Sequence, residues 1–500
     1  MISLVEETRG AVEPAGPLRD IAVSSIEYDS RKVVPGSLFA AVKGFSSDGF
    51  DYIDAAVAKG AAAVMVSSER VRELERIGGK GVALIAAADD RKGLSALADA
   101  FYGHPSRSMT VVGVTGTNGK TSITYMLESV FRHAGKNPGV IGTVNYRWSN
   151  VSLAAPNTTP ESKDLQEILF RMKADGVDVV IMEVSSHALK LNRVDHISFD
   201  AAVFTNLTRD HMDFHPDFED YFSSKLRLFD ILDAGEKEIR AGAVNGDDEY
   251  GRRILSLRGR YSYPLISFGS GDHEIRVVPG SVSNKITGLK YRITIGGDAA
   301  ADLGLRLAGK FQLYNSLAAF AAAYSLGVPS ETIRLGLEAV VQVPGRFDVV
   351  HSEEGFSVVV DYAHTGDAML KLLQSVRELD SHRVITVFGC GGDRDKTKRP
   401  IMGGVAEENS DICIVTSDNP RTEEPGAIIR DILAGMKRGN HRVVPDRETA
   451  IREAIMAAER NDIIVIAGKG HEDYQILGRT KIHFDDREMA AKYIKAREAR

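Results

Sequence analysis

The chain has 500 residues, about three times the length of a common domain, which predicts two to four domains. Hydrophobic residues make up 43% and charged residues 26%, which excludes a disordered or coiled-coil chain. The 62 Lys and Arg against 69 Asp and Glu give a formal net charge of −7, which excludes a bulk basic surface for nucleic acid.

Cysteine content and hydropathy point to the compartment. Only Cys390 and Cys413 are present, which excludes a disulfide framework and fits a reducing environment. The start, Met1 to Gly10, lacks the apolar segment of a secretory signal. The apolar stretches, such as that from Leu317 to Ala323, are too short to cross a bilayer. We therefore expect a soluble, cytoplasmic protein with no membrane span.

Strands and helices alternate along the chain in three α/β blocks, which we place at 1–107, 108–343 and 344–500. The first block is predicted to contain strands at 37–42 and 61–67 and a helix at 51–59. The second is predicted to contain strands at 109–114, 177–184 and 199–206, helices at 121–134, 163–174 and 314–325, and a β-rich stretch at 265–307. The third is predicted to contain strands at 357–361, 383–388, 412–416 and 463–467.

A glycine-rich turn between the strand at 109–114 and its helix has the sequence Gly116-Thr117-Asn118-Gly119-Lys120-Thr121. Glycines let backbone N–H groups surround phosphate oxygens, and the helix N-terminus adds its positive end. Lys120 supplies a charge for the phosphates and the Thr121 hydroxyl a ligand for Mg²⁺. The strict phosphate-loop pattern is not met, because Val114 stands where it needs glycine. A chance glycine turn is the alternative.

Two further segments carry candidate metal ligands. Glu183 ends the buried strand at 177–184, so it is predicted at the ligand-binding edge of the sheet, or else facing solvent. His211 and His215 have a spacing that suits zinc on a helix, but the flanking Asp210 and Asp213 favour a loop. Because Mg²⁺ prefers oxygen, the residues alone leave a metal role for His211 open.

Lys225 borders the apolar face that Phe222, Leu226 and Phe229 form on a predicted helix. A lysine there can extend its ammonium to water, which the residues alone favour. The alternative is a partly desolvated lysine with a chemical role.

The set of motifs resembles the ATP-dependent Mur ligases over about residues 20–490. It comprises Gly116–Thr121, Glu183-Val-Ser-Ser-His187, Asn206-Leu-Thr-Arg-Asp-His211, Lys225, Pro344-Gly-Arg346-Phe, Asp361-Tyr-Ala-His364, Phe388-Gly-Cys-Gly-Gly-Asp-Arg-Asp395, Asp418-Asn-Pro-Arg421 and Gly468-Lys-Gly-His-Glu472. The resemblance implies a small N-terminal α/β domain, a central P-loop-type doubly wound ATPase domain and a C-terminal Rossmann-like domain. Within the family, the sequence most resembles the members that add diaminopimelate to UDP-N-acetylmuramoyl-L-alanyl-D-glutamate. These members act through an acyl phosphate, in peptidoglycan precursor synthesis.

The resemblance also implies residue roles. The catalytic residues would be Lys120, Glu183, His211 and Lys225. ATP would be bound by Gly116, Thr117, Asn118, Gly119, Lys120, Thr121, Ser122, Asn315, Arg346, Asp361 and His364. Mg²⁺ would be held by Thr121, Glu183, His211 and Lys225, the last as a carbamate. The UDP-muramoyl-dipeptide would be bound by Ser30, Gly44, Phe45, Ser46, Asn157, Thr158, Thr159, Ser185 and Arg193.

For the amino acid, the resemblance implies Arg394, Asp418, Asn419, Pro420, Arg421, Gly468 and Glu472. Diaminopimelate differs from lysine by a carboxylate at its far end, and a guanidinium such as that of Arg421 matches a carboxylate with two hydrogen bonds. Without the resemblance, the less favoured alternative for Arg421 is a surface arginine in a turn after Pro420.

Three functions compete. The first is the diaminopimelate ligase, working as a monomer. The second is a related ligase that adds lysine, or that adds glutamate to folate. The Asp29-Ser-Arg-Lys-Val-Val-Pro-Gly36 unit, which resembles a UDP-sugar domain, weakens the folate hypothesis. The third is a P-loop switch or motor, which the lack of a guanine-reading motif after the strand at 199–206 disfavours.

Overall fold

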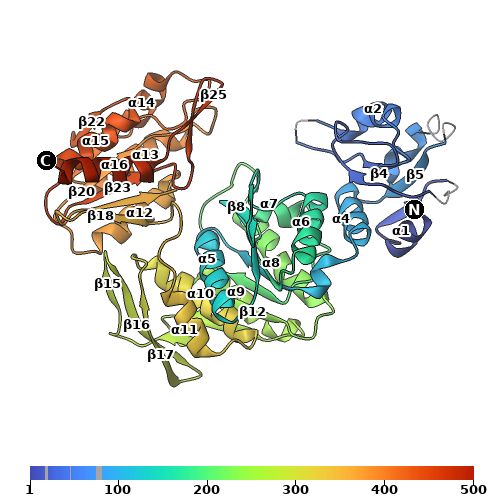
Figure 1. Ribbon diagram of the computed structural model, residues 1–500, viewed down its shortest axis with the longest axis horizontal. Coiled ribbons are helices and arrows are strands. Elements are labelled where there is room, and N and C mark those ends of the chain that lie inside the picture. The colour runs from blue at the N-terminus through green and yellow to red at the C-terminus, as the bar shows by residue number, and fades with distance from the viewer. Residues whose placement is uncertain (17–20, 46, 75–80, 500) are drawn as a thin grey trace. The chain divides into compact units, whose positions relative to one another are not determined.

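The structure is a computed structural model that describes residues 1–16, 21–45, 47–74 and 81–499 (Figure 1). The chain forms two compact units. One contains Met1–Lys120, Phe131–Ser267 and Ala321–Pro329, and the other contains Thr121–Val130, Phe268–Phe320 and Ser330–Arg500. The predicted domain limits at 107 and 343 stay a prediction.

The N-terminal part of the first unit is a small sheet with the strand order β1-β5-β4-β3-β2. Strands β2 to β5 run parallel, and β1 lies antiparallel to β5. The strands are β1 (Val12–Pro14), β2 (Ile26–Glu27), β3 (Leu38–Ala40), β4 (Ala63–Ser67) and β5 (Ala83–Ala87). The helices are α1 (Ile2–Glu7), α2 (Ile53–Ala58), α4 (Asp90–Phe101) and the 3₁₀ helices η1 (Gly49–Tyr52), η2 (Ser68–Leu74) and η3 (Pro105–Ser108). The predicted strands at 37–42 and 61–67 and the helix at 51–59 are confirmed.

The rest of the first unit is built on the strand order β12-β11-β6-β10-β7-β8-β9. Strands β6, β7, β10, β11 and β12 run parallel, and β8 and β9 continue antiparallel. The strands are β6 (Thr110–Thr115), β7 (Pro138–Ile141), β8 (Asn145–Trp148), β9 (Val151–Ala154), β10 (Val179–Glu183), β11 (Ala201–Phe204) and β12 (Ala241–Asn245). The helices are α5 (Lys120–His133), α6 (Ser162–Ala174), α7 (Ser186–Lys190), α8 (Phe218–Ala234), α9 (Glu249–Ser256) and η4 (Arg258–Arg260).

Continuous apolar runs explain the parallel sheet. Every residue of β10 and β11 is buried, as expected for parallel strands that helices cover on both faces. At Gly113 in β6 a Cβ atom would lie 2.8 Å from the ring of Phe199, so only glycine allows this close approach.

The second unit contains the strands that continue this 12-stranded sheet, in the order β15-β16-β14-β13 with β17 paired to β16. It also contains a six-stranded sheet, in the order β18-β19-β23-β20-β21-β22, and a hairpin. The continuing strands are β13 (Leu265–Gly269), β14 (Ile275–Val277), β15 (Ser283–Lys285), β16 (Gly288–Ile295) and β17 (Asp298–Leu305). The other strands are β18 (Asp348–His351), β19 (Ser357–Asp361), β20 (Val384–Phe388), β21 (Ile412–Val415), β22 (His441–Val443), β23 (Ile463–Ala467), β24 (Tyr474–Leu477) and β25 (Thr480–His483). The helices are α10 (Phe311–Ser325), α11 (Ser330–Glu338), α12 (Gly366–Arg377), α13 (Lys398–Asn409), α14 (Pro425–Leu433), α15 (Arg447–Ala457) and α16 (Asp486–Glu498).

Helices cover both faces of the β18–β23 sheet. Met369, Met402 and Ile428, from α12, α13 and α14, belong to one core cluster. Ile451 and Ile494, from α15 and α16, belong to the other. Parallel strands enclosed by two helical layers confirm the predicted α/β class. Among the described residues, no helix combines the length and apolar character that a bilayer crossing needs.

Candidate functional site

The glycine-rich turn lies between β6 and α5, as predicted. Gly116 and Gly119 have φ angles of 137° and 93°, a region that favours glycine. A Cβ atom on Gly116 would lie 1.9 Å from the Thr205 Oγ1, so a side chain cannot be placed there. Lys120 Nζ donates to the carbonyl oxygens of Gly116 and Thr117 at 2.8 and 2.9 Å, which holds its charge over the loop. Thr121 and Ser122 follow in the first turn of α5 and are buried.

Residues at the end of β11 and just after it hold this turn in place. The sequence analysis did not predict this role. Thr117 N donates to Asn206 O at 2.8 Å, and Asn118 N donates to Asn206 Oδ1 at 3.1 Å. Thr205 Oγ1 donates to Asn118 O at 2.6 Å. The Asn206-Leu-Thr motif carried the only sequence signal for this role.

Glu183 ends β10 beside the phosphate loop, because β10 pairs with β6 and Glu183 faces Val114 across the ladder. It is 1% exposed, so the solvent-facing alternative is wrong. Its carboxylate accepts from Thr143 N at 2.9 Å and from Thr143 Oγ1 at 3.0 Å. The carboxylate is thus fixed at the carboxyl edge of the sheet.

Lys225 lies in α8 with 1% of its surface exposed, so the interpretation of a lysine extended to water is wrong. Its Nζ donates to Gly116 O at 2.9 Å and lies 4.5 Å from the ring centroid of Tyr221. Burial, and then the nearby charge of Lys120, lower its pKa well below the ordinary value. Lys225 therefore has access to the neutral amine under conditions in which an ordinary lysine is charged.

His211 lies in a loop rather than on a helix, as its acidic neighbours predicted, and its φ of 55° is left-handed. Its side chain is 45% exposed. Its ring meets that of His187 edge-on, with centroids 4.9 Å apart, and His187 stacks on Phe214 at 3.9 Å. Burial and the neighbouring charge of His211 lower the pKa of His187 to about 4.

Within the described ranges, no three His, Cys, Asp or Glu side chains converge as a metal cage. The donor set is nevertheless suitable for Mg²⁺, which commonly takes one or two carboxylates and completes its shell with water and substrate phosphates. Glu183 supplies one such carboxylate, and Lys225 would supply a second oxygen ligand only after carbamylation.

Four of the residues predicted for the acceptor substrate are connected around the end of β10. Thr159 Oγ1 donates to Glu183 O at 2.8 Å, and Ser185 N donates to Thr159 Oγ1 at 3.1 Å. Arg193 Nη1 donates to Thr159 O at 3.1 Å, and Thr158 Oγ1 lies 3.1 Å from the Thr143 hydroxyl. Ser185 also caps α7 by accepting from Ala188 N at 3.1 Å. Asn157 is exposed, and its carbonyl accepts from Tyr146.

The residues predicted for the uridine diphosphate lie in two turns. Ser30 follows β2, and its carbonyl accepts from Lys59 Nζ at 3.0 Å. Gly44 N donates to Ser47 O at 2.9 Å, which closes the second turn, and Phe45 is 75% exposed. Ser46 lies outside the described residues.

In the second unit, the residues predicted to contact ATP are held by local bonds. Asn315 Nδ2 donates to Gln312 Oε1 at 2.9 Å. Asp361 accepts from the backbone N–H groups of Phe347 and Ala363 at 2.7 and 2.8 Å, and burial raises its pKa. The Arg346 guanidinium lies 4.9 Å from the Tyr362 ring centroid, and the exposed His364 donates to Tyr362 O at 2.8 Å.

The residues predicted for the amino acid lie together at the carboxyl edge of the β18–β23 sheet. Asn419 Nδ2 donates to Glu472 Oε2 at 2.8 Å. A Cβ atom on Gly468 would lie 2.6 Å from Asp418 Oδ2, so Gly468 leaves room for that carboxylate. Burial raises the pKa of Glu472, against the opposing effect of Lys469. Pro420 is buried beside Asn419. This cluster joins two carboxylates, which suit an ammonium ligand.

Arg421 and Arg394 add positive charge next to these carboxylates. Arg421 Nη1 donates to Gly392 O at 2.8 Å, and Arg421 is half-buried with a φ of 51°. An ordinary exposed turn is therefore not its setting. Arg394 is exposed, and its Nη1 donates to Asp393 O at 3.3 Å. Arg399 and Glu423, which support both loops, were missed by the sequence analysis.

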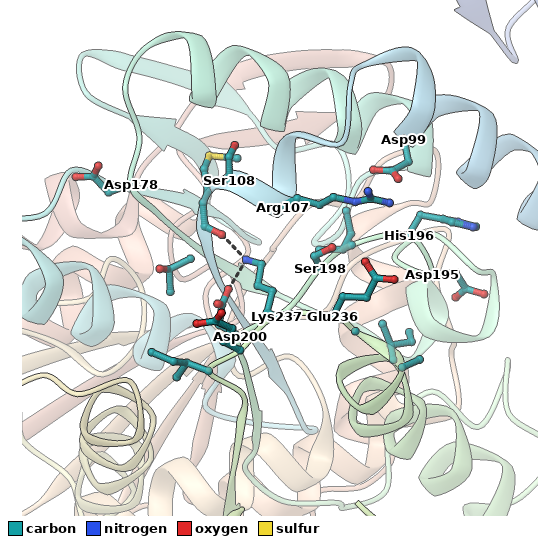
Figure 2. A pocket seen from close by; sticks show the side chains of 18 of the residues that line it. Asp99, Arg107, Ser108, Asp178, Asp195, His196, Ser198, Asp200, Glu236 and Lys237 are labelled. Carbon is teal, nitrogen blue, oxygen red and sulfur yellow. Dashed lines mark hydrogen bonds and ion pairs between the residues drawn. The ribbon is translucent and has the colours of Figure 1, made fainter. Parts of the chain in front are cut away.

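A hollow of about 1040 Å³ lies at the opposite edge of the central sheet, where β6, β10 and β11 begin (Figure 2). Lys237 projects into it and pairs with Asp200 at 2.5 Å, and it also donates to Met109 O. Asp200 in turn accepts from Val111 N at 2.7 Å. The Lys237–Asp200 ion pair thus links the start of β11 to the start of β6.

Comparison with known proteins gives matches along nearly the whole chain. Three family models match it: the Mur ligase family catalytic domain at residues 22–102, the Mur ligase middle domain at residues 114–323 and the Mur ligase glutamate ligase domain at residues 345–470. A protein of Clostridioides difficile named UDP-N-acetylmuramoyl-L-alanyl-D-glutamate–2,6-diaminopimelate ligase is 44% identical, covering 94% of this chain and 95% of its own. A protein of the same name from Geobacter sulfurreducens is 44% identical, covering 97% of each chain.

Solved structures give a consistent result. A structure of a protein with that same ligase name superposes with a TM-score of 0.70 at 28% identity and covers 97% of each chain. Folylpolyglutamate synthase of Mycobacterium tuberculosis, complexed with ADP and AMPPCP, superposes with a TM-score of 0.61 at 20% identity and covers 74% of this chain and 91% of its own. At that identity the second likeness concerns the fold alone.

Proposed function

This chain belongs to the Mur ligase family, and from that premise we propose that it joins meso-2,6-diaminopimelate to UDP-N-acetylmuramoyl-L-alanyl-D-glutamate at the expense of ATP. The reaction is a step of peptidoglycan precursor synthesis. The observation that carries the proposal is the 44% identity to two ligases of that name over almost their full length, together with the Asp418-to-Arg421 segment clustered on Glu472.

The phosphate loop is the proposed site of acyl phosphate formation. The substrate carboxylate attacks the γ-phosphorus of ATP, ADP leaves, and an acyl phosphate results. This transfer needs positioning and charge neutralisation more than covalent help from the protein. Lys120 faces the phosphates from the loop that Gly116 and Gly119 shape, and Asn315, Arg346, Asp361 and His364 are proposed to contact the nucleotide as well.

The buried Lys225 supports a metal site after modification. A neutral amine adds to CO₂, forming an N–C bond and releasing a proton, and the product is an anionic carbamate. The low pKa of Lys225 supplies that neutral amine. We propose Glu183, Thr121, His211 and carbamylated Lys225 as the residues that hold Mg²⁺, which would offset phosphate charge in the reaction.

The acceptor substrate is proposed to lie along Thr159, Ser185 and Arg193, with Asn157 and Thr158 beside them. Hydroxyl and guanidinium groups are suitable donors to carboxylate oxygens. Ser30, Gly44, Phe45 and Ser46 are proposed to hold the uridine diphosphate.

The amino acid is proposed to bind with its far ammonium near Asp418 and Glu472 and its far carboxylate on Arg421 and Arg394. Its reacting amine then attacks the acyl phosphate carbon, inorganic phosphate leaves, and the amine loses a proton. Lysine carries the ammonium but lacks the carboxylate, so the two arginines favour diaminopimelate. We also propose that the enzyme acts as a monomer in the cytoplasm, where ATP and both other substrates are available.

A direct assay tests the proposal. Purified enzyme with ATP and Mg²⁺ should release phosphate only when UDP-muramoyl-dipeptide and meso-diaminopimelate are both present, and mass spectrometry should find the tripeptide product. Equal turnover with L-lysine would remove the specificity claim. Turnover with a folate and glutamate instead would replace the proposal by the folate alternative, which so far rests on likeness of fold.

A further inference from the structure

The two arginines proposed for the far carboxylate sit on loops that contact each other directly. Residues 391–394 follow β20 and residues 419–423 follow β21, and these strands are parallel neighbours. Gly392 N donates to Asn419 O at 2.9 Å, and Arg421 Nη1 donates to Gly392 O at 2.8 Å. A Cβ atom on Gly392 would lie 1.9 Å from Pro420 O, so the backbones touch. The direction of the Arg421 side chain therefore depends on the position of the other loop.

Each loop holds a non-glycine residue in the left-handed region. Asp393 has a φ of 54° and Arg421 a φ of 51°. The Asp393 carboxylate accepts from Thr422 N at 3.2 Å and from Thr422 Oγ1 at 2.8 Å. Such conformations persist only where surrounding contacts hold them, and they are common at ligand sites. Residues that bind both loops are therefore needed to hold Asp393 and Arg421 in these conformations.

One such group is Arg399, near the start of α13, with 0% of its side chain exposed. Its Nη1 and Nη2 donate to the two oxygens of Glu423 at 3.0 and 2.8 Å, and Nη1 also donates to Asp431 at 2.8 Å. Its Nη2 reaches Gly391 O at 3.3 Å. Glu423 Oε1 in turn accepts from Asp393 N at 2.6 Å, so one carboxylate links the buried guanidinium to both loops.

The Glu423 carboxylate in this link is held in its charged form. The hydrogen bonds from Arg399, and then that from Asp393 N, lower the pKa of Glu423 to about 2. A second cation, Lys396, lies 3.2 Å from the same carboxylate. Only an arginine can reach both Glu423 oxygens, Asp431 and Gly391 from one planar group, and a lysine carries the charge without that fork.

We propose that Arg399 is a positioning residue for the amino-acid substrate: through Glu423 it holds loops 391–394 and 419–423 together and so fixes the direction in which Arg421 and Arg394 meet the substrate's far carboxylate. The inference rests on the proposed function. It assigns substrate selection partly to a buried group that does not touch the substrate.

The test measures steady-state kinetics of Arg399→Lys in the full-length enzyme. The KM for meso-diaminopimelate should rise about tenfold, because small displacements of a paired guanidinium weaken binding strongly. The KM for ATP and that for UDP-muramoyl-dipeptide should stay within about twofold. The ratio of kcat/KM for meso-diaminopimelate to that for L-lysine should fall by a similar factor, because lysine has no far carboxylate to lose.

A matched control is Arg383→Lys. Arg383 also forms a paired contact with a buried carboxylate, that of Asp462, but at the opposite edge of the same sheet. This control should leave the selectivity ratio unchanged. In an Arg421→Ala background, Arg399→Lys should lower the ratio by a smaller factor than in the wild type, because only the part of its effect that passes through Arg394 remains.

The outcomes separate the two proposals. A wild-type enzyme that does not use diaminopimelate overturns both. If the wild type is active, an unchanged selectivity ratio in Arg399→Lys, or an equal rise in all three KM values, overturns the positioning role alone. Circular dichroism and thermal unfolding show whether each variant folds. Should Arg399→Lys fail to fold, the same kinetic ratio is measured on Glu423→Gln. Failure of both to fold would make Arg399 a purely structural residue and also overturn the inference.

Discussion

The phosphate loop and the two loops proposed to bind the amino acid (391–394 and 419–423, the amino-acid loops) are held in place by partly different contacts. Around Gly116 the loop is shaped by glycines and by hydrogen bonds from its backbone to Asn206 O and Asn206 Oδ1, and a Cβ atom on Gly116 has no room. Around Arg421 the loops touch through their backbones and are also joined by a charged link between Glu423 and Arg399. The triphosphate end of ATP is the same in every reaction of this family, whereas the amino acid differs. Glycines shape the loop proposed for the constant group, and a charged side-chain link is added where the group varies.

This difference has a consequence for mutation. A glycine in a backbone loop has no conservative substitute, so changes at the phosphate loop should be severe and should affect every amino-acid substrate alike. A side-chain link can be weakened in steps, so changes at the amino-acid loops should be smaller and should affect selectivity.

Lys225→Ala should lower kcat at least about 100-fold, because removing a group that stabilises developing charge has effects of that size. A short-chain carboxylate added to the assay should restore part of the activity, since it can occupy the place of the carbamate. Phosphate release at saturating substrates measures both effects, and an intact rate would contradict the metal-ligand role.

Lys237→Met is the matched control for Lys225. It removes another largely buried lysine, but at the hollow on the opposite edge of the sheet, where Lys237 pairs with Asp200. We expect a loss of about 1–3 kcal/mol in the free energy of unfolding, from the unpaired carboxylate, with kcat unchanged.

Gly116→Ala should raise the KM for ATP more than about tenfold, because misplacing a loop that positions reacting groups is costly. The added methyl group would lie 1.9 Å from Thr205 Oγ1, and the φ of 137° is unfavourable for alanine. Gly135→Ala has a φ of 72° but nothing within 4 Å, so it should cost stability and leave the KM for ATP unchanged. Equal kinetics for both variants would refute a backbone-shaped phosphate site.

Arg421→Ala should raise the KM for meso-diaminopimelate with a loss of about 1–3 kcal/mol, as for a charge-assisted hydrogen bond. The KM for ATP should be unaffected, which separates the two regions. Kinetics identical to those of the wild type would remove Arg421 from the site.

Glu472→Gln should have the smallest effect on stability, and it should be favourable at neutral pH. Burial raises the pKa of Glu472 above 4.5, so between pH 4.5 and that raised pKa the folded chain keeps a proton that the unfolded chain has released. Stability from this group is therefore fully present below pH 4.5 and is lost as the pH rises through the folded pKa.

At pH 7 this group therefore contributes less stability than at pH 4.5, and glutamine, which stays neutral, avoids that loss. We expect the variant to gain about 1 kcal/mol at pH 7, with the gain disappearing near pH 4.5, while its KM for diaminopimelate rises. Denaturant unfolding at several pH values measures the first effect. A variant less stable than the wild type at pH 7 would show that Glu472 stabilises the fold instead.

The sequence could predict the elements that depend on local order. The strands at 357–361 and 463–467 match β19 and β23 because a continuous run of β-branched residues has no other stable place than a buried parallel strand. The phosphate turn was predictable for the same reason, since strand, glycines, lysine and helix follow one another within about a dozen residues. The family resemblance added candidate residues from all three parts of the chain.

Burial and pairing were less predictable. From its neighbours alone, Lys225 was expected to reach water. It is instead enclosed between Gly116, in the loop after β6, and Tyr221, one turn earlier in the same helix. Arg399 and Glu423 are charged residues separated by 24 positions, and no periodicity marks two such residues as partners. Thr143, which holds Glu183, was likewise unmarked.

The sequence by itself thus determined the α/β class, the order of the elements and the place of the phosphate loop, because these follow from local hydrophobic patterns and from glycines in a fixed spacing. Only the tertiary structure decided which charged groups are buried, which carboxylate each guanidinium meets and how the loops after β20 and β21 hold one another. Those features depend on contacts between distant segments, where desolvation, rather than local order, sets the chemistry of a side chain.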